Sequence, residues 1–289
     1  MIEFFYGYSG QLLLTFAILA IAASGWSVIF GTGMFSMAPS ATMGIGAYGA
    51  AVAYTHWGIP FPIATVIGVV LAAVVSALLS LFAWRLDHLF LGIATLGVAE
   101  FLVALAHKTP YVGGSLGMPA GFDATPPVVL ITLVIVVFAL WLLRRTRLFS
   151  AMRAVGDDTL AAQSVGIDTR KMKVIASIVG GVILGVSGAL YTFQLGSIIP
   201  SNFGFSMIVQ IILAVLIGGR DSLFGPVVGA AVVIALPELA RLVSVDHSIA
   251  YGLALMLIVL LRPQGLIPGG RPRWLRAKSV RAVQAGITS

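Results

Sequence analysis

Long apolar runs separated by short polar connections occupy most of the chain. An apolar helix needs roughly 20 residues to cross a bilayer core about 30 Å thick, and shorter runs can cross inside a bundle, so nine of these runs are candidate spans. They cover residues 11–30, 36–55, 61–84, 89–106, 127–143, 174–196, 204–218, 223–240 and 249–261. The pattern predicts an all-α fold, a polytopic membrane helix bundle of about nine (eight to ten) transmembrane segments. The membrane domain would cover residues 1–268 and precede a basic tail at 269–289.

The start of the bundle departs from this regular pattern. The connection between the first two runs, 31–35, is very short, and Pro39 near the start of the second run breaks helices. One of the first two segments is therefore a candidate for a broken or re-entrant helix. Irregular backbone at membrane depth is tolerated only where it is buried in protein or lines a cavity.

The composition supports a membrane protein and excludes several other classes. Hydrophobic residues make up 59% of the chain and charged residues only 9%, against about 25% charged residues in an average soluble domain. So few charges cannot cover a water-facing surface, and the same shortage excludes disordered, collagen-like and nucleic-acid-binding proteins. Cysteine is absent, which excludes disulfides, thiolate metal sites and cysteine nucleophiles.

The basic residues predict which side of the membrane each connection faces. Short loops rich in Lys and Arg stay on the cytoplasmic side. When alternate connections are counted, 15 of the 17 basic residues fall on one side: Arg85, the seven from Arg144 to Lys173, Arg220 and the six from Arg262 to Arg281. Only Lys108 and Arg241 fall on the other side. We therefore predict a multi-pass protein with a cytoplasmic C-terminus and an external N-terminus.

Small residues recur four positions apart in several runs. Helices in lipid associate through close backbone contact, and stripes of small residues allow it. Such stripes predict helix packing at Ser177, Gly181, Gly185 and Ala189 in one run and at Gly225 and Gly229 in another. A hinge or pore-lining role is the alternative for each stripe.

Glu100 lies inside the fourth predicted span, where a charged side chain is costly and tends to face a cavity or a partner. It is a candidate translocation-path or gate residue, and the alternative is a structural carboxylate that is paired or protonated. Glu238 lies near the external end of its span with Arg241 three residues on, which favours an interfacial ion pair. The histidines are isolated from one another, so we predict no metal site, and we identify no catalytic residue.

The longest hydrophilic stretch, 144–173, predicts a short helix outside the membrane. Asp157 and Asp158 lie where an N-cap and a first helical turn favour negative charge, and Gly166 is placed to end the helix. Between them the chain has the spacing A-A-x-x-x-G, which begins at Ala161 and Ala162. This helix of two to three turns would lie on the cytoplasmic face.

The hydrophilic stretch resembles the EAA-type loop through which the permease of a bacterial ABC importer sits in a groove on its ATPase. Leu160 occupies a position that often holds Glu in that pattern, but the wider string RAVGDDTLAAQSVGI at 153–167 is similar to the version in branched-chain amino-acid permeases. Other segments resemble the same family in the same order: MGIGAY at 43–48, TLGVAE at 95–100, GGSLG at 113–117, SGALY at 187–191, SLFGP at 222–226, LPE at 236–238 and RPQGL at 262–266. Over residues 30–268 the chain resembles the M-type permease subunit of the leucine/isoleucine/valine ABC importer family.

The resemblance implies an importer of the bacterial inner membrane with several partners. These are a second permease of a different, H-type chain, two cytoplasmic ATPase subunits and an external solute-binding protein, with membrane lipid around them and no nucleic acid. The resemblance also implies the site residues. Candidate ATPase-coupling residues are Asp157, Asp158, Leu160, Ala161, Ala162 and Gly166, and candidate path or gate residues are Gly44, Gly46, Tyr48 and Glu100.

The chain itself has no phosphate-binding loop of the G-x-x-x-x-G-K-[ST] type, since no Gly-Lys pair occurs in it. We therefore expect no cofactor in this chain, with ATP and Mg²⁺ in the partner ATPases. The predicted function is that of a permease subunit, not an enzyme, which forms the path for a small polar solute with the second permease. Branched-chain amino acids are the default solute, and other amino acids, urea, short amides and aromatic acids stay open.

Two other functions are alternatives at this point. A stand-alone secondary transporter would use intramembrane carboxylates for ion coupling, and only Glu100 offers that chemistry. A membrane-embedded enzyme would need a convergent cluster of His, Asp or Glu at a membrane face, which the sequence does not indicate.

Overall fold

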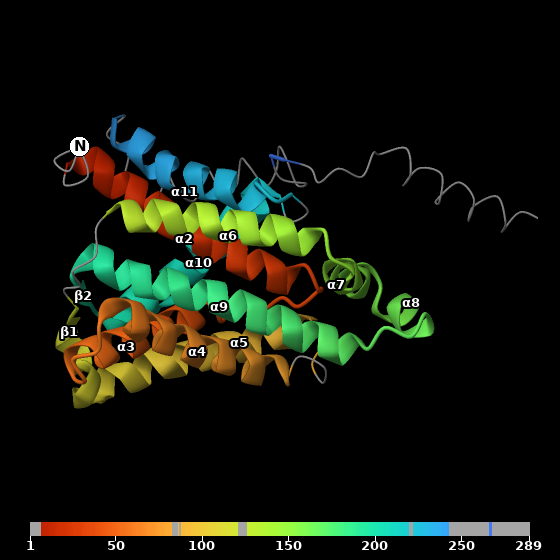
Figure 1. Ribbon diagram of the computed structural model, residues 1–289, viewed down its shortest axis with the longest axis horizontal. Helices are drawn as coiled ribbons and strands as arrows, with labels where there is room; N and C mark the ends of the chain where they lie inside the picture. Colours follow the sequence, from red (N-terminus) through yellow and green to blue (C-terminus); the bar gives the residue numbers. More distant parts are fainter. Residues whose placement is uncertain are drawn as a thin grey trace, which may run out of the picture.

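The computed structural model describes residues 7–82, 86, 88–120, 126–219, 222–242, 266 and 267. Eight of the helices in this part of the chain run side by side in one elongated bundle (Figure 1). They are α2 (Tyr8–Phe30), α3 (Pro39–Thr55), α4 (Phe61–Ser80), α5 (His88–Lys108), α6 (Pro127–Arg144), α9 (Thr169–Leu195), α10 (Phe205–Gly218) and α11 (Gly225–Leu242). The prediction of an all-α membrane bundle is confirmed.

Each of the first eight predicted apolar runs coincides with one of these helices. In the described residues, six stretches are long and apolar enough to cross a membrane: Tyr8–Phe30, Phe61–Ser80, Phe90–Lys108, Pro127–Arg144, Thr169–Leu195 and Pro200–Gly218. Helix α3, with 17 residues, and the apolar part of α11 are shorter. The ninth predicted run, 249–261, and the tail at 269–289 lie outside the described residues, so the count of nine stays a prediction.

Helix α2 lies at the centre of the bundle. Every residue from Ala17 to Ile29 is buried, because α6, α9, α10 and α11 pack around this helix. A helix that is apolar on all sides is suited either to lipid or to such an interior position. Its uniformly apolar sequence is therefore explained by helix packing rather than by contact with lipid.

Helices α3, α4 and α9 pack closely against one another. A Cβ atom on Gly46 of α3 would lie only 2.5 Å from the Cα of Gly185 in α9, so the two backbones are in direct contact. On the next turn of α9, a Cβ atom on Gly181 would lie 2.6 Å from the Cβ of Ser76 in α4. The Ser76 hydroxyl donates a 2.7 Å hydrogen bond to the backbone carbonyl of Ser177. Glycine and serine at these positions allow the three helices to approach one another.

The chain between α2 and α3 turns back along α2 before the second helix begins. Trp26 is fully buried, stacks on Phe30 and donates from Nε1 to the carbonyl of Ser36 at 2.8 Å. The backbone N–H of Met37 donates to the hydroxyl of Thr95 in α5 at 2.8 Å. The irregular backbone thus lies between the first two helices rather than within either, and side chains satisfy its polar groups.

The two ends of the bundle are different (Figure 1). Two short helices, α7 (Arg147–Asp157) and α8 (Thr159–Ser164), project from one end. At the other end, β1 (Met118–Pro119) pairs antiparallel with β2 (Ser197–Ile198), beside the 3₁₀ turns η1 (Pro110–Val112), η2 (Gly114–Leu116) and η3 (Pro200–Phe203). Helix α2 begins at this second end, so its first turn lies far from α7 and α8.

Candidate functional site

Helix α7 lies across the end of the bundle and is amphipathic. The hydroxyl of Thr146 caps its first turn by accepting a 3.3 Å hydrogen bond from the N–H of Phe149. Met152 and Val155, three residues apart, are buried against the bundle. The hydrophilic stretch was predicted to hold one short helix, and α7 is a second one. The N-cap threonine and the apolar residues at helical spacing were the signals that could have predicted it.

A short helix follows at once, where the sequence predicted one. The carboxylate of Asp158 accepts hydrogen bonds from the N–H groups of Leu160 at 2.9 Å and Ala161 at 3.0 Å, and so caps α8. Gly166 ends the helix in the left-handed region, with φ of 82°, and its N–H donates to the carbonyl of Gln163. Helix α8 has six residues, fewer than the two to three turns expected, and Asp157 belongs to α7.

The first turn of α9 holds the C-terminal end of α8 in place. Asp168 accepts a 3.0 Å hydrogen bond from the N–H of Lys171, and the ammonium group of Lys171 lies 3.3 Å from the same carboxylate. This backbone hydrogen bond, with smaller contributions from the Lys171 side chain, holds the pKa of Asp168 below its usual value. The side chain of Gln163 in α8 donates to the hydroxyl of Thr169 at 3.2 Å. The position of α8 is therefore defined from both of its ends.

The outer surface of α8 exposes apolar side chains outside the bundle. Leu160 is 78% exposed and Val165 is 74% exposed, whereas Ala162 is buried. An open groove of about 500 Å³ lies between α7 and α8, and Arg153, Asp157 and Asp158 are among the residues that line it. Exposed apolar residues beside a polar groove are typical of a protein-docking surface. We call helices α7 and α8 together the projecting helix pair.

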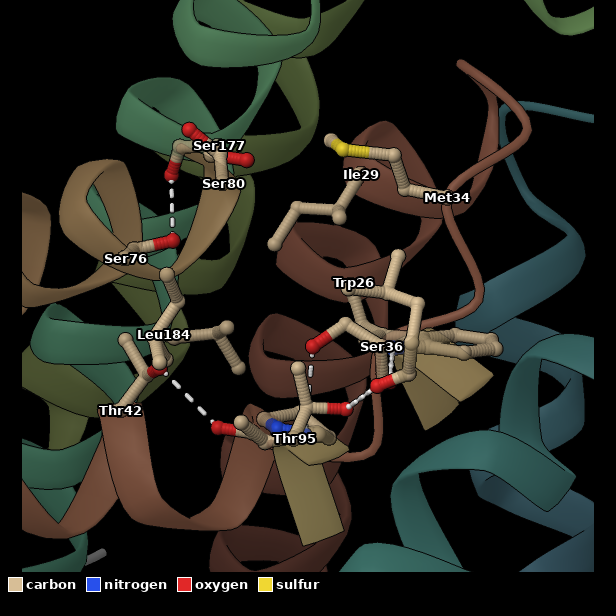
Figure 2. A pocket seen from close by; sticks show the side chains of 14 residues that line it. Trp26, Ile29, Met34, Ser36, Thr42, Ser76, Ser80, Thr95, Ser177 and Leu184 are labelled. Carbon is tan, nitrogen blue, oxygen red and sulfur yellow. Dashed lines mark hydrogen bonds between the residues drawn. The ribbon is translucent and has the colours of Figure 1, made fainter. Parts of the chain in front are cut away.

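A small cavity lies where the chain turns back between α2 and α3 (Figure 2). Hydroxyl groups line it from several elements: Ser36, Thr42, Ser76, Ser80, Thr95 and Ser177. Its space of about 20 Å³ is enough for about one water molecule. Figure 2 shows the hydroxyls of Ser76 and Thr42 directed into hydrogen bonds with backbone carbonyls. The cavity is too small for an amino acid, so it is a contact between helices rather than a solute site.

Three of the predicted path residues lie on α3 inside this chain. Gly44 faces the ring of Phe203, and a Cβ atom there would lie 3.0 Å from it. Gly46 contacts Gly185, and the ring of Tyr48 packs edge-on against Phe203 with centroids 6.0 Å apart. All three residues therefore make packing contacts within the bundle.

The predicted packing residues lie where α9 meets α4 and where α10 meets α11. Ser177, Gly181 and Gly185 face α4 in succession. Ala189 is buried in a cluster with Ala50 and Met118. The backbones of Gly225 and Gly229 in α11 lie directly against α10.

Glu100 lies on the outside of α5 and is exposed. Gly97, one turn earlier, is exposed as well, and nothing lies within 4 Å of the position that its Cβ atom would take. Within the described part of the chain, no group of three or more His, Asp or Glu side chains is arranged to hold a metal ion.

Comparison with known proteins assigns the bundle to a family. The family described as "Branched-chain amino acid transport system / permease component" matches residues 8–262, which is most of the chain. The chain belongs to this family. As a member of it, the protein is a transport permease component of the membrane and not an enzyme, which confirms the resemblance found in the sequence.

Individual relatives of this permease component carry consistent names. It is 26% identical to the "high-affinity branched-chain amino acid transport system permease protein LivM" of Escherichia coli (strain K12), over 89% of this chain and 69% of the relative. The protein of the same name from Salmonella typhimurium (strain LT2) is 25% identical over 92% of this chain and 71% of its own. The "galactofuranose transporter permease protein YtfT" of Escherichia coli (strain K12) is 27% identical over 75% of this chain and 67% of its own. No solved structure matches this permease component.

Proposed function

We propose that this permease component docks through its projecting helix pair onto an ATPase subunit of an ABC importer. One observation carries the proposal: Leu160 and Val165 expose apolar side chains on a capped helix outside the apolar bundle. A helix of six residues has little stability of its own, and here Asp158 and Gly166 define both its ends. Such a rigid element is suited to transmit movement from a partner to the bundle.

The end of the bundle with the projecting helix pair is proposed to be cytoplasmic. This assignment follows the concentration of basic residues in the stretch 144–173, and it places the first turn of α2 on the external side. The N–H of Leu266 donates to the carbonyl of Ile217 at the end of α10, whereas α11 ends at the opposite end of the bundle. These positions support nine spans and a C-terminus on the side of the helix pair. The membrane is proposed to be the bacterial inner membrane, as the sequence resemblance implies.

The proposed assembly contains two permeases, two ATPase subunits and an external solute-binding protein. The second permease is proposed to be a different, H-type chain, as the sequence resemblance implies. ATP and Mg²⁺ are proposed to bind to the ATPase subunits, since this chain lacks a phosphate-binding loop. The solute is proposed to be a branched-chain amino acid, supported by the names of two relatives, while the name of a third shows that similar permeases serve a sugar.

The residues on α3 are proposed to act on the path through packing. Gly44, Gly46 and Tyr48 determine how closely α3 approaches α9 and Phe203, and any movement of these helices changes those contacts. The six coupling residues are proposed to divide into two groups. Leu160 and Ala161 touch the ATPase, whereas Asp157, Asp158, Ala162 and Gly166 shape and support the helix pair.

The docking proposal is tested by co-purification of the ATPase with two matched variants. Leu160→Asp places a charge on the proposed docking surface, and Leu116→Asp places the same charge on a 96% exposed residue at the other end of the bundle. Both side chains are exposed, so neither change should alter folding by more than about 0.5 kcal/mol. The proposal predicts that Leu160→Asp lowers recovery of the ATPase at least about tenfold, since a buried unpaired charge costs several kcal/mol, while Leu116→Asp leaves it unchanged. Equal recovery with both variants would contradict docking through α8.

A further inference from the structure

Helix α5 has an outward face that differs from that of its neighbour α4. The exposed positions of α5 include three small residues and one carboxylate among large apolar side chains: Phe90, Ile93, Ala94, Gly97, Glu100, Phe101, Ala104 and Leu105. The exposed residues of α4 are instead all apolar and none is smaller than proline: Pro62, Ile63, Val66, Val70, Leu71, Val74 and Leu78. Both helices expose large apolar residues that are suited to lipid, but only α5 also exposes small residues and a carboxylate.

Glu100 lies well inside the apolar stretch of α5, at a depth where its surroundings can be inferred from its charge. Glu100 is the eleventh of the 19 residues in the apolar stretch Phe90–Lys108, about 12 Å from its end at 1.5 Å per residue. No hydrogen bond or ion pair reaches the Glu100 carboxylate from the residues that the structure describes. A charged side chain exposed to hydrocarbon at this depth is strongly unfavourable. In the working assembly, this face therefore meets water or protein.

The small residues beside Glu100 support contact with water or protein in a second way. The glycines of α3 and α9 lie against neighbouring helices, but the Cβ position of Gly97 is open on all sides within 4 Å. Packing against the residues that the structure describes therefore does not require a glycine there. Together with Ala104, which is also exposed, Gly97 leaves space on both sides of the carboxylate.

We propose that this face of α5 lines a water-filled path between this chain and a second permease chain, where the Glu100 carboxylate receives the cationic amino group of the solute. The inference rests on the proposed function, which supplies the second permease and an amino-acid solute. It goes beyond that function by naming the helix face and the chemical group that it recognises.

An ammonium group fits this site better than a metal ion does. Calcium and magnesium need six or more oxygen ligands, and Glu100 belongs to no group of three or more possible metal-ligating side chains among the described residues. One carboxylate can bind a primary ammonium group through a charge-assisted hydrogen bond. Water in the path would solvate the solute's own carboxylate. A single weak contact of this kind also allows the solute to leave, which a transport path requires.

Cysteine labelling tests whether the α5 face meets water. The chain has no natural cysteine, so Gly97→Cys and Ala104→Cys each introduce one unique thiol, and Val70→Cys and Val74→Cys on α4 are matched controls. The reagent is a charged, membrane-impermeant thiosulfonate, applied to the complex assembled in membranes. Only a hydrated thiol ionises and reacts readily, so we expect the α5 positions to react at least about tenfold faster than the α4 positions. Equal and slow labelling at all four positions would overturn the water-filled path.

Uptake measurements test the role of the carboxylate itself. Glu100→Gln keeps the size of the side chain and removes its charge, and Glu100→Asp keeps the charge. We expect the maximal uptake rate of a zwitterionic amino acid to fall about tenfold in the first variant and to recover in part in the second, since a charged hydrogen bond exceeds a neutral one by about this factor. Glu238→Gln, on another helix, is the control. Unchanged uptake in Glu100→Gln would overturn the proposed contact with the ammonium group.

These results are distinguishable from failure of the proposed function. If the ATPase does not co-purify with the unmodified chain, the proposed function fails and the inference fails with it. If the complex forms and imports an amino acid while the α5 thiols stay unlabelled, only the inference about α5 is overturned.

Discussion

The backbone of Gly156 in α7 lies directly against the carbonyl group of Gly31 at the end of α2. A Cβ atom at position 156 would also lie 3.1 Å from the backbone nitrogen of Gly33. Helix α7 therefore contacts the connection between α2 and α3. This connection turns back along α2, and the hydrogen bond from Trp26 of α2 to the carbonyl of Ser36 holds it there. The contact between Gly156 and Gly31 joins the proposed docking surface to α2, the central helix of the bundle.

A bulky residue at position 156 should break this contact. Gly156→Val forces α7 away from Gly31, at a cost of about 1–3 kcal/mol for overpacking. We expect ATPase binding through α8 to persist, while uptake per ATP hydrolysed falls, since the movement of α7 no longer reaches α2. Arg147→Val, an exposed position on the same helix, is the control. Coupled uptake at the unmodified level in Gly156→Val would contradict this role of the contact.

Two substitutions of Asp158 distinguish the effect of its charge on docking from the effect of its N-cap on the stability of α8. Asp158→Ala removes both hydrogen bonds to the first turn and should destabilise α8 by about 0.5–2 kcal/mol. Asp158→Asn removes the charge but leaves a side chain that caps well. We expect ATPase recovery to fall in the alanine variant and to stay near the original level in the asparagine variant. An equal loss in both would show that the charge, and not the cap, matters for docking.

Gly166 tests backbone conformation without steric crowding. Its φ is 82°, and nothing lies within 4 Å of the position of a Cβ atom there. Asparagine tolerates this left-handed conformation, whereas a β-branched residue does not. Gly166→Val should therefore lower ATPase recovery more than Gly166→Asn does. Thermal unfolding of the isolated chain should change little in either variant, because α8 lies outside the bundle.

Asp168 gives the start of α9 a dependence on pH. Its pKa is lowered in the folded chain by the hydrogen bond from the Lys171 N–H, so the ionised carboxylate stabilises the first turn. This contribution is present above the pKa of the unfolded chain and is lost as the pH falls through the lower folded value, below about 4. We expect amide exchange at Lys171, corrected for intrinsic rates, to rise in that range. Asp168→Asn should cap the helix without this dependence on pH. Identical pH profiles of amide exchange in the original chain and in this variant would contradict the role given to the Asp168 carboxylate.

The sequence predicted the helices well because the bilayer imposes one length and one composition on them. Eight runs were located to within a few residues. The end of α8 followed from Gly166 and its start, to within about one residue, from Asp157 and Asp158, because capping chemistry is local. The sequence did not separate α7 from the surrounding stretch, since only Thr146 and an amphipathic pattern mark it.

The arrangement of the helices could not be predicted in the same way. Helix α2 is apolar on every side, so nothing in its own sequence indicates that it is central rather than exposed to lipid. The outward direction of Glu100 likewise depends on which face of α5 packs against its neighbours. The sequence also does not distinguish the environments of two glycines. Only the fold shows that Gly46 is enclosed by α9 and that Gly97 is open among the described residues.

Reconstituted uptake tests the central claim most directly. The complex purified with this chain is placed in proteoliposomes, with the solute-binding protein and labelled leucine on the side opposite the projecting helix pair. We predict accumulation of leucine that requires ATP on the side of the helix pair and stops in Leu160→Asp. Accumulation driven by an ion gradient without ATP, and unaffected by that substitution, would contradict the assignment to an ABC importer.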